Sequence, residues 1–116
     1  MKLAVVLNGE NKLSPLDMGE KIDLIDTDEK KILEYENPGF QRPHGGKEIA
    51  MSVILQIKPD ALAVKEGFLC PGSYRMSVNR IKYALTNAGD LEELLSEINN
   101  LNHNLVEDLS VEIFRE

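Results

Sequence analysis

The sequence predicts a three-layer α/β domain in which a five-stranded mixed sheet lies between helices, with its second strand antiparallel. Three observations carry this prediction. The apolar run 3–7 stops at Asn8, which is typical of a strand buried on both faces. Segments 49–57 and 91–98 carry apolar residues at helical spacing. Strand-like segments alternate with these helices, and right-handed crossovers then make the first, fourth and fifth strands parallel.

The first half of the chain predicts three strands. Segment 3–7 is the central strand, and residues 8–19 follow it as a long, partly mobile loop with few apolar anchors. Segments 22–25 and 32–35 are the second and third strands. The polar turn 27–30 between them is short enough to make an antiparallel hairpin, which leaves the third strand parallel to the first.

The middle of the chain alternates helix and strand. A helix over 49–57 ends at Lys58-Pro59, because proline disfavours helix in the residue before it. Segment 61–64 is the fourth strand. Pro71, a residue favoured at the first helical position, opens a short helix, and 81–85 is the fifth strand.

The last quarter of the chain predicts two more helices. Asp90 and Glu93 have the spacing of a capping box at the start of a leucine-rich helix. The polar stretch 99–104 predicts a break. Beyond it, apolar residues recur every four positions and predict a C-terminal helical extension over about 104–115, although 111–114 also fits a strand.

Composition limits the class of protein. The 116 residues form a single domain, 1–116, and thirteen basic against twenty acidic residues give a net charge of −7. An average field of this sign disfavours nucleic acid and anionic membranes as partners. The apolar start of the chain is too short for a signal peptide or a membrane span, and a single cysteine excludes an internal disulfide. We therefore expect a cytoplasmic protein.

Three loops rich in glycine or proline follow strands that end on one edge of the predicted sheet. They are residues 8–19, 37–46 and 66–72. Open α/β sheets bind ligands at the carboxyl ends of their strands. We therefore expect these loops to gather there and to form a ligand crevice.

The segment His44-Gly45-Gly46 leads into a helix. Free amides and the helix dipole at such a position favour an anion, and glycine permits close approach of the backbone. The alternative is a solvated loop that needs glycine for its turn. The Lys-Ser/Thr pair of a phosphate loop is absent from this sequence.

Cys70 precedes a helix start, where the dipole favours a thiolate that can act as nucleophile or metal ligand. A small buried hydrophobic residue is the commoner role for a lone cysteine. One cysteine and two histidines cannot build a self-contained zinc or iron–sulfur site. The second histidine, His103, is expected at the surface.

No catalytic constellation stands out. A Gly-x-Ser-x-Gly elbow is absent, and the first strand has no carboxylate of the kind a metal-dependent nuclease needs. Acidic residues beside the loop edge can hold a hard cation, but an acidic surface is the simpler interpretation; they are Glu10, Asp17, Glu20 and Glu66. We expect a protein that is not an enzyme.

A set of short motifs runs along most of the chain: Lys2-Leu3-Ala4-Val5, Ser14-Pro15, Gly19, the hairpin from Asp23 to Glu36, Glu36-Asn37-Pro38, His44-Gly45-Gly46, Cys70-Pro71-Gly72-Ser73-Tyr74, Tyr83-Ala84-Leu85 and Asp90-Leu91-Glu92-Glu93-Leu94-Leu95. Together these motifs resemble the dinitrogenase iron-molybdenum cofactor biosynthesis family, which includes nitrogenase accessory factors. The resemblance covers a core of about residues 2–98. It implies a ribonuclease H-like motif and a non-enzymatic carrier of iron-molybdenum cofactor or its iron–sulfur precursors.

The chain also departs from the pattern of that family. Relatives commonly continue from the first-loop serine into His-Phe-Gly or Arg-Phe-Gly, whereas Ser14-Pro15 is followed here by Leu16-Asp17-Met18-Gly19. An imidazole or basic contact to an anionic cluster is replaced by an acid. A thiol at Cys70 and an imidazole at His44 are the available substitutes.

The leading hypothesis is a metallocluster or small-anion carrier. Cys70 is the soft metal ligand, His44 is the second, and the amides of Gly45, Gly46 and Gly72 contact the anion. The competing hypothesis is a protein-interaction or regulatory module that binds a partner chain and no metal.

Overall fold

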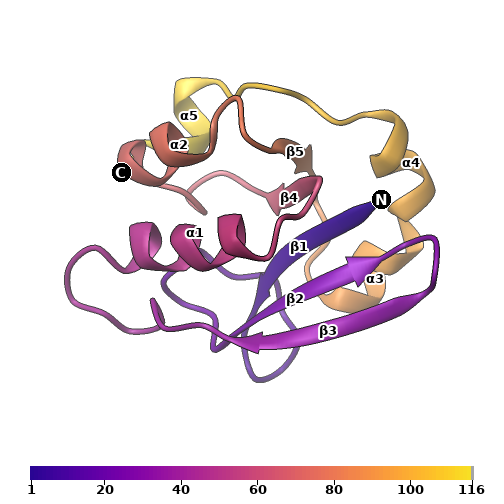
Figure 1. Cartoon of the computed structure of the whole chain (residues 1–116), viewed down its shortest axis with the longest axis horizontal. Helices are drawn as coiled ribbons and strands as arrows, with labels where there is room; N and C mark the ends of the chain where they lie inside the picture. Colours follow the sequence, from indigo (N-terminus) through magenta and orange to yellow (C-terminus); the bar gives the residue numbers. More distant parts are fainter. Residues whose placement is uncertain (116) are drawn as a thin grey trace.

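The computed structural model describes residues 1–115, which form one five-stranded sheet with flanking helices (Figure 1). The strand order is β3-β2-β1-β4-β5. The strand bounds are β1 Lys2–Leu7, β2 Lys21–Asp26, β3 Lys31–Glu36, β4 Ala61–Val64 and β5 Lys82–Leu85. The helix bounds are α1 Gly46–Gln56, α2 Pro71–Ser77, α3 Leu91–Ser96, α4 Ile98–His103 and α5 Val111–Phe114.

Strand directions agree with the predicted mixed sheet. β1 is antiparallel to β2, and β2 is antiparallel to β3. β4 lies parallel to both β1 and β5. The predicted hairpin is therefore confirmed, and β2 is the one antiparallel strand of the five.

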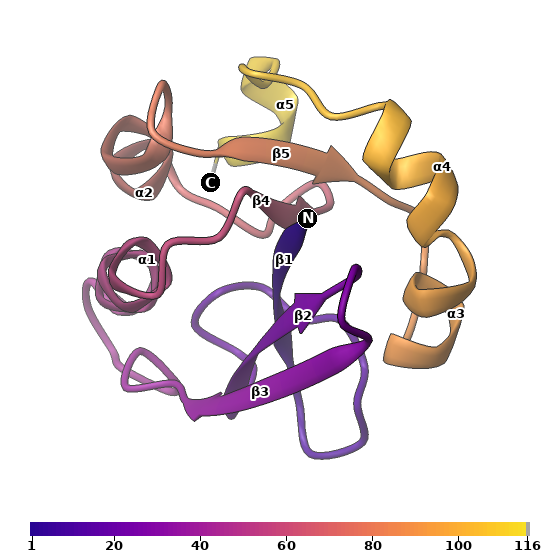
Figure 2. The same ribbon diagram turned by 45° about the vertical axis from the view of Figure 1, so that its right-hand side comes forward.

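Each face of the sheet carries its own apolar core, which confirms the three-layer prediction. Alternate residues of the strands pack against α1, α2 and α5 on one face, and the others pack against α3 and α4 on the opposite face. Figure 2 shows the sheet between these helix layers. None of the helices described has the length and apolar character needed to cross a membrane.

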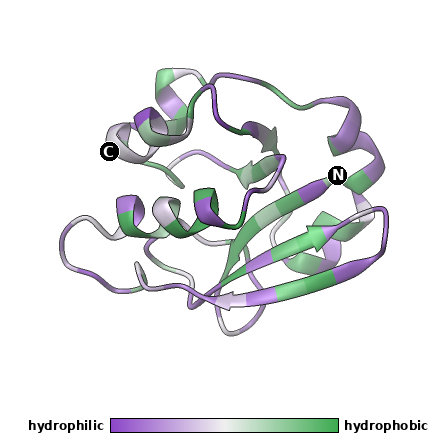
Figure 3. Cartoon of the chain, in the orientation of Figure 1, coloured by the Kyte–Doolittle hydropathy of each residue, from purple (hydrophilic) through white to green (hydrophobic). Residues whose placement is uncertain are grey.

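β1 is the central strand because it is apolar on both sides. Leu3 to Leu7 are all buried, and hydrogen-bonded neighbours lie on either side of the strand. In Figure 3 most of β1 and β4 is coloured hydrophobic. A continuous apolar run has no polar face for solvent, so a position between two helix layers is the one that accommodates it.

The helix starts follow local capping chemistry. α1 begins at Gly46, three residues before its predicted start, with Gly45 as N-cap. Asp90 caps α3 by accepting from the Glu93 amide at 2.9 Å. In a capping box the Glu93 side chain would accept from the amide of Asp90, the N-cap residue. Here Glu93 Oε2 accepts instead from the amide of Gly89, one residue earlier, at 3.1 Å.

The predicted break at 99–104 is wrong for most of its length. Helix α4 covers Ile98–His103, and it is mostly hydrophilic in Figure 3. Ile98 and Leu101 pack into the core under this layer, so tertiary burial outweighs the weak helix propensity of asparagine. Asn104 Nδ2 donates to the Asn100 carbonyl at 2.7 Å and closes the helix end.

The predicted helix over 104–115 is wrong for residues 105–110. Val106 pairs with Tyr83 instead, with N–H···O distances of 2.9 and 2.8 Å, and extends the β5 edge. Helix α5 is limited to Val111–Phe114. The free edge of β5 offers an amide and a carbonyl to Val106, and pairing with them takes the place of an intrahelical bond.

Candidate functional site

The three loops that the sequence predicts at one edge of the sheet do meet there. The Leu16 amide donates to the Phe68 carbonyl at 3.1 Å, and the Gln41 amide donates to the Asp17 carbonyl at 2.9 Å. Leu16 is fully buried, which supplies the apolar anchor that the sequence interpretation did not find in residues 8–19. The convergence of loops 8–19, 37–46 and 66–72 is therefore confirmed.

A pocket of about 240 Å³ lies where these loops converge. Its lining residues come from the first loop, the α1 entrance and the α2 entrance: Asp17, Arg42, Pro43, His44, Gly45, Gly46, Lys47, Glu48 and Cys70. Four of the five predicted ligand-contacting residues thus share one pocket. The fifth, Gly72, lies outside the lining, beside Glu48.

Cys70 is buried, with 2% of its surface exposed, and caps helix α2. Its thiol donates to Glu48 Oε1 at 2.6 Å. The Ser73 amide donates to the same sulfur at 3.4 Å, and Ser73 Oγ accepts from the Cys70 amide at 2.9 Å. The sulfur therefore has internal partners on both sides, and a ligand must displace Glu48 to reach it.

His44 is exposed at the pocket rim, and Gly45 follows it as the N-cap of α1. Gly45 has a φ of 71°, a left-handed conformation that favours glycine. The cap has no side-chain hydrogen bond. The first amides of α1 are therefore not capped by a side chain where they meet the pocket, which is the arrangement that favours an anion.

Gly46 and Gly72 have packing roles. A Cβ at Gly46 would lie 2.7 Å from the Gly39 carbonyl oxygen and 2.9 Å from Asp17 Cβ. A Cβ at Gly72 would lie 2.9 Å from Glu48 Oε1. Close backbone contact thus explains Gly46 without any ligand, whereas at Gly72 the near atom is the end of the flexible Glu48 side chain.

The charged side chains of the pocket balance. Asp17 and Glu48 are acidic, whereas Arg42 and Lys47 are basic. Arg42 Nε donates to the Pro38 carbonyl at 2.9 Å. Lys47 Nζ donates to the Gly67 carbonyl at 3.2 Å, so the side chain joins the start of α1 to the loop 66–72. Arg42 lines the same pocket as Asp17, so a guanidinium and a carboxylate share it.

The sequence interpretation missed Glu48, Arg42 and Lys47 as pocket residues. An acid in the first helical turn is common for electrostatic reasons, so Glu48 carried no signal of a site. Its only sequence cue is its place in the helical turn that follows His44-Gly45-Gly46. The long-range contact with Cys70 is a tertiary feature that spacing cannot reveal.

The remaining candidates do not converge. Asp17 lines the pocket, but within residues 1–115 no group of three or more His, Cys, Asp or Glu side chains is arranged to hold a metal ion. Glu10, Glu20 and Glu66 are all exposed, which fits the acidic-surface interpretation. His103 is exposed at the end of α4, as expected.

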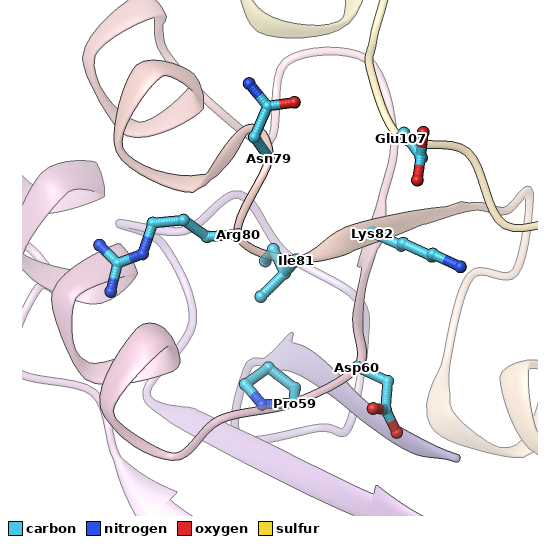
Figure 4. A pocket seen from close by; sticks show the side chains of 7 residues that line it. All are labelled: Pro59, Asp60, Asn79, Arg80, Ile81, Lys82 and Glu107. Carbon is cyan, nitrogen blue, oxygen red and sulfur yellow. The ribbon is translucent and has the colours of Figure 1, made fainter.

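A second depression, of about 310 Å³, lies near the starts of β4 and β5, at the end of these strands opposite to the loops described above. Figure 4 shows that its labelled side chains point in different directions: Arg80 extends to one side of the pocket and Lys82 to the other. In this arrangement Arg80 and Lys82 do not converge on one point of the pocket. The chemistry therefore favours the pocket beside Cys70.

Comparison of the sequence with known proteins gives no relative. No protein-family model matches the chain, and no curated protein matches it significantly.

Solved structures do share the fold. The apo form of the orange protein from Desulfovibrio gigas aligns with a TM-score of 0.73 and 14% identity, over 94% of this chain and 93% of that one. A Thermotoga protein provisionally named NifB aligns with a TM-score of 0.68 and 14% identity, over 99% and 97% of the two chains. A protein from Methanocaldococcus jannaschii, provisionally named a dinitrogenase, gives a TM-score of 0.58 and 15% identity, over 92% and 93%. At these identities the likeness establishes the fold.

Proposed function

We propose that this chain is a non-enzymatic carrier of the dinitrogenase iron-molybdenum cofactor biosynthesis type, which holds a metallocluster or another anionic ligand beside Cys70. One observation carries the proposal: a thiol, an imidazole and the start of α1, all expected from the sequence, line a single pocket. Two of the structural neighbours carry names from nitrogenase biochemistry, which supports the same class of ligand.

The donor set limits how a cluster would bind. Iron–sulfur clusters are commonly held by four thiolates, whereas this pocket offers one thiol and one imidazole. The cargo would therefore keep most of its own sulfide or thiolate ligands. A partial donor set of this kind suits a carrier, which must also release its cargo.

Glu48 has a defined part in this proposal. A thiolate, and not a thiol, is the metal ligand, so the Cys70 proton must leave when metal binds. Glu48 Oε1, 2.6 Å from the sulfur, is placed to accept it. Movement of the Glu48 side chain would then open the path to the sulfur.

Anaerobic titration with an iron–sulfur cluster, followed by optical absorption and iron analysis, tests the proposal. We expect stoichiometric uptake by the native chain and loss of uptake in Cys70→Ser with His44→Ala. Serine keeps the α2 cap, because a hydroxyl accepts from the Ser73 amide as sulfur does. His103→Ala, at an exposed histidine outside the pocket, is the matched control and should bind normally. Absent uptake, or uptake that survives the double substitution, would refute the cluster version.

The internal partners of Cys70 favour a second candidate, an interaction or regulatory module without metal. A sulfur that is 2% exposed and bonded to Glu48 and Ser73 already has a structural role. In this case Cys70→Ser leaves the binding of partner proteins unchanged. Substitutions of the exposed pocket rim, such as His44→Ala or Arg42→Ala, should instead reduce recovery of a partner protein in pull-down experiments.

A further inference from the structure

Strand β3 is the open edge of the sheet. Among the described helices and strands, β2 is the one that packs extensively against it (Figure 1). Five of its six residues are exposed, and the sixth is partly exposed. The other edge differs, because Val106 pairs with Tyr83 of β5 and covers part of it. An uncovered edge presents unpaired amides and carbonyls to another chain.

The pairing of β3 with β2 fixes which backbone groups are free. The Asn37 amide donates to the Glu20 carbonyl at 3.0 Å, in register with the pair Lys21 and Glu36. Hydrogen-bonded pairs alternate along antiparallel strands, so residues 31, 33 and 35 bond to β2. The backbone groups of residues 32, 34 and 36 therefore point outward.

The side chains of the same strand are unusually apolar for an exposed edge. Ile32 and Leu33 are 43% and 55% exposed and lie on opposite faces of the sheet. In Figure 3 a stretch of β3 is coloured hydrophobic between hydrophilic ends. An edge with apolar groups on both faces gains from being covered.

We propose that β3 pairs antiparallel with β3 of a second copy of this chain, around a twofold axis at Leu33, and joins the two sheets into one. Leu33 of each copy then meets Leu33 of the other at a non-hydrogen-bonded position. Ile32 lies opposite Glu34 of the second copy, and their outward backbone groups exchange hydrogen bonds on each side of the axis. Two exposed leucines are thereby buried against each other.

Neighbouring registers are less favourable. An axis at Glu34 places two carboxylates directly opposite each other, which is destabilising. An axis at Ile32 places Glu34 opposite Lys30 of the other copy. Lys30 has a left-handed φ of 57° and cannot continue the ladder. The Leu33 register is the one that uses only extended residues and opposes no like charges.

Charge at the two ends of the ladder also fits this register. Glu36 of one copy points toward the turn that carries Lys30 and Lys31 of the other. Both lysines belong to a shallow groove that has Ile25 and Ile32 in its wall. Within that turn Lys31 already pairs with Glu29 at 3.6 Å, so Lys30 is the charge that Glu36 of the other copy meets, and the symmetry repeats this contact at both ends.

Disulfide trapping tests the register. In Leu33→Cys the two new cysteines lie at a non-hydrogen-bonded pair, with Cα atoms about 4.5 Å apart, within the reach of a disulfide. In Ile32→Cys they lie diagonally, about 7–8 Å apart, beyond that reach. Mild oxidation should therefore link most of the first variant and little of the second. Equal linking of both variants, or none of the first, overturns the proposal.

Sedimentation equilibrium over a concentration series tests the association itself. We expect the native chain to dimerise and Leu33→Lys to raise the dissociation constant about tenfold or more, because two ammonium groups then meet on the axis. Val111→Lys is the matched control: Val111 is 56% exposed but lies on α5, and this variant should dimerise normally. A native chain that stays monomeric, or a dimer that persists in Leu33→Lys, overturns the proposal.

Discussion

Asp23 is a charged residue in an apolar layer. It is 2% exposed on β2, between Val5 of β1 and Glu34 of β3, and its Oδ1 atom has no hydrogen-bond partner among the described residues. Burial raises the pKa of this carboxyl. Lys21 lowers that pKa in part, and Glu34 raises it further. The fold therefore disfavours the ionised form of Asp23 relative to the unfolded chain.

We predict that Asp23→Asn stabilises the protein at neutral pH. Because the folded-state pKa is raised, the stability of the native chain is fully present below the ordinary carboxyl pKa and falls as pH rises through the folded value. An amide of the same shape cannot ionise, so the variant avoids this loss. Urea unfolding of the native chain and of Asp23→Asn at pH 4 and pH 7 measures the gain in free energy of unfolding, and this gain should be larger at pH 7.

Asp26, three residues along the same strand, provides a control of opposite sign. The amides of Glu29 and Asp28 each donate to Asp26 Oδ1 at 3.1 Å and lower the pKa of Asp26. Its stabilising effect is present above the ordinary carboxyl pKa and is lost as pH falls through the lowered value. Asp26→Asn should therefore destabilise at pH 7. The same sign of change in both variants would contradict the burial argument.

The residues of the candidate site were predictable to different degrees. His44, Gly45, Gly46 and Cys70 follow strands that topology places at one edge, so their convergence follows from strand order and crossover handedness. The contact from Cys70 to Glu48 was not predictable, since it depends on how α1 and α2 pack. Side-chain pairing between elements leaves no periodic trace in a sequence.

At the scale of elements, helix caps give a quantitative prediction. Asp90→Ala removes an acceptor for the Glu93 amide and should reduce the free energy of unfolding by about 1 kcal/mol. Ser110 occupies the same position on α5 but makes no side-chain cap bond, so Ser110→Ala should have a much smaller effect. Thermal or urea unfolding of the two variants measures this difference. Equal losses would mean that the Asp90 cap does not stabilise α3.

The errors in element prediction have a common physical cause. Residues 99–104 are polar by composition, yet Leu101 anchors them in the core as part of α4. Residues 105–110 have helical spacing, yet the edge of β5 captures Val106. In both segments, contacts with distant residues outweigh local helix or loop preference. Those contacts form only in the folded sheet, so the local sequence does not reveal them.

For the molecule as a whole, the apolar run of β1 determines most of the architecture. A strand buried on both faces requires helices on both sides, and the hairpin 21–36 and the crossover to β4 then fill its two edges. This is why the layers and strand directions could be predicted without any contact information. Stability should decrease outward from β1 for the same reason.

Hydrogen exchange in dilute solution tests this gradient. The amides of residues 4–6 in β1 have strands on both sides and helices on both faces, so they should exchange only when the whole chain unfolds. In β3 the amides of residues 31, 33 and 35, which bond to β2, should exchange slowly. Those of residues 32, 34 and 36, which point outward, should exchange fast. Uniform protection along β3 in a monomeric sample would contradict the alternation deduced from the Asn37–Glu20 bond, and with it the free edge on which pairing between two copies depends.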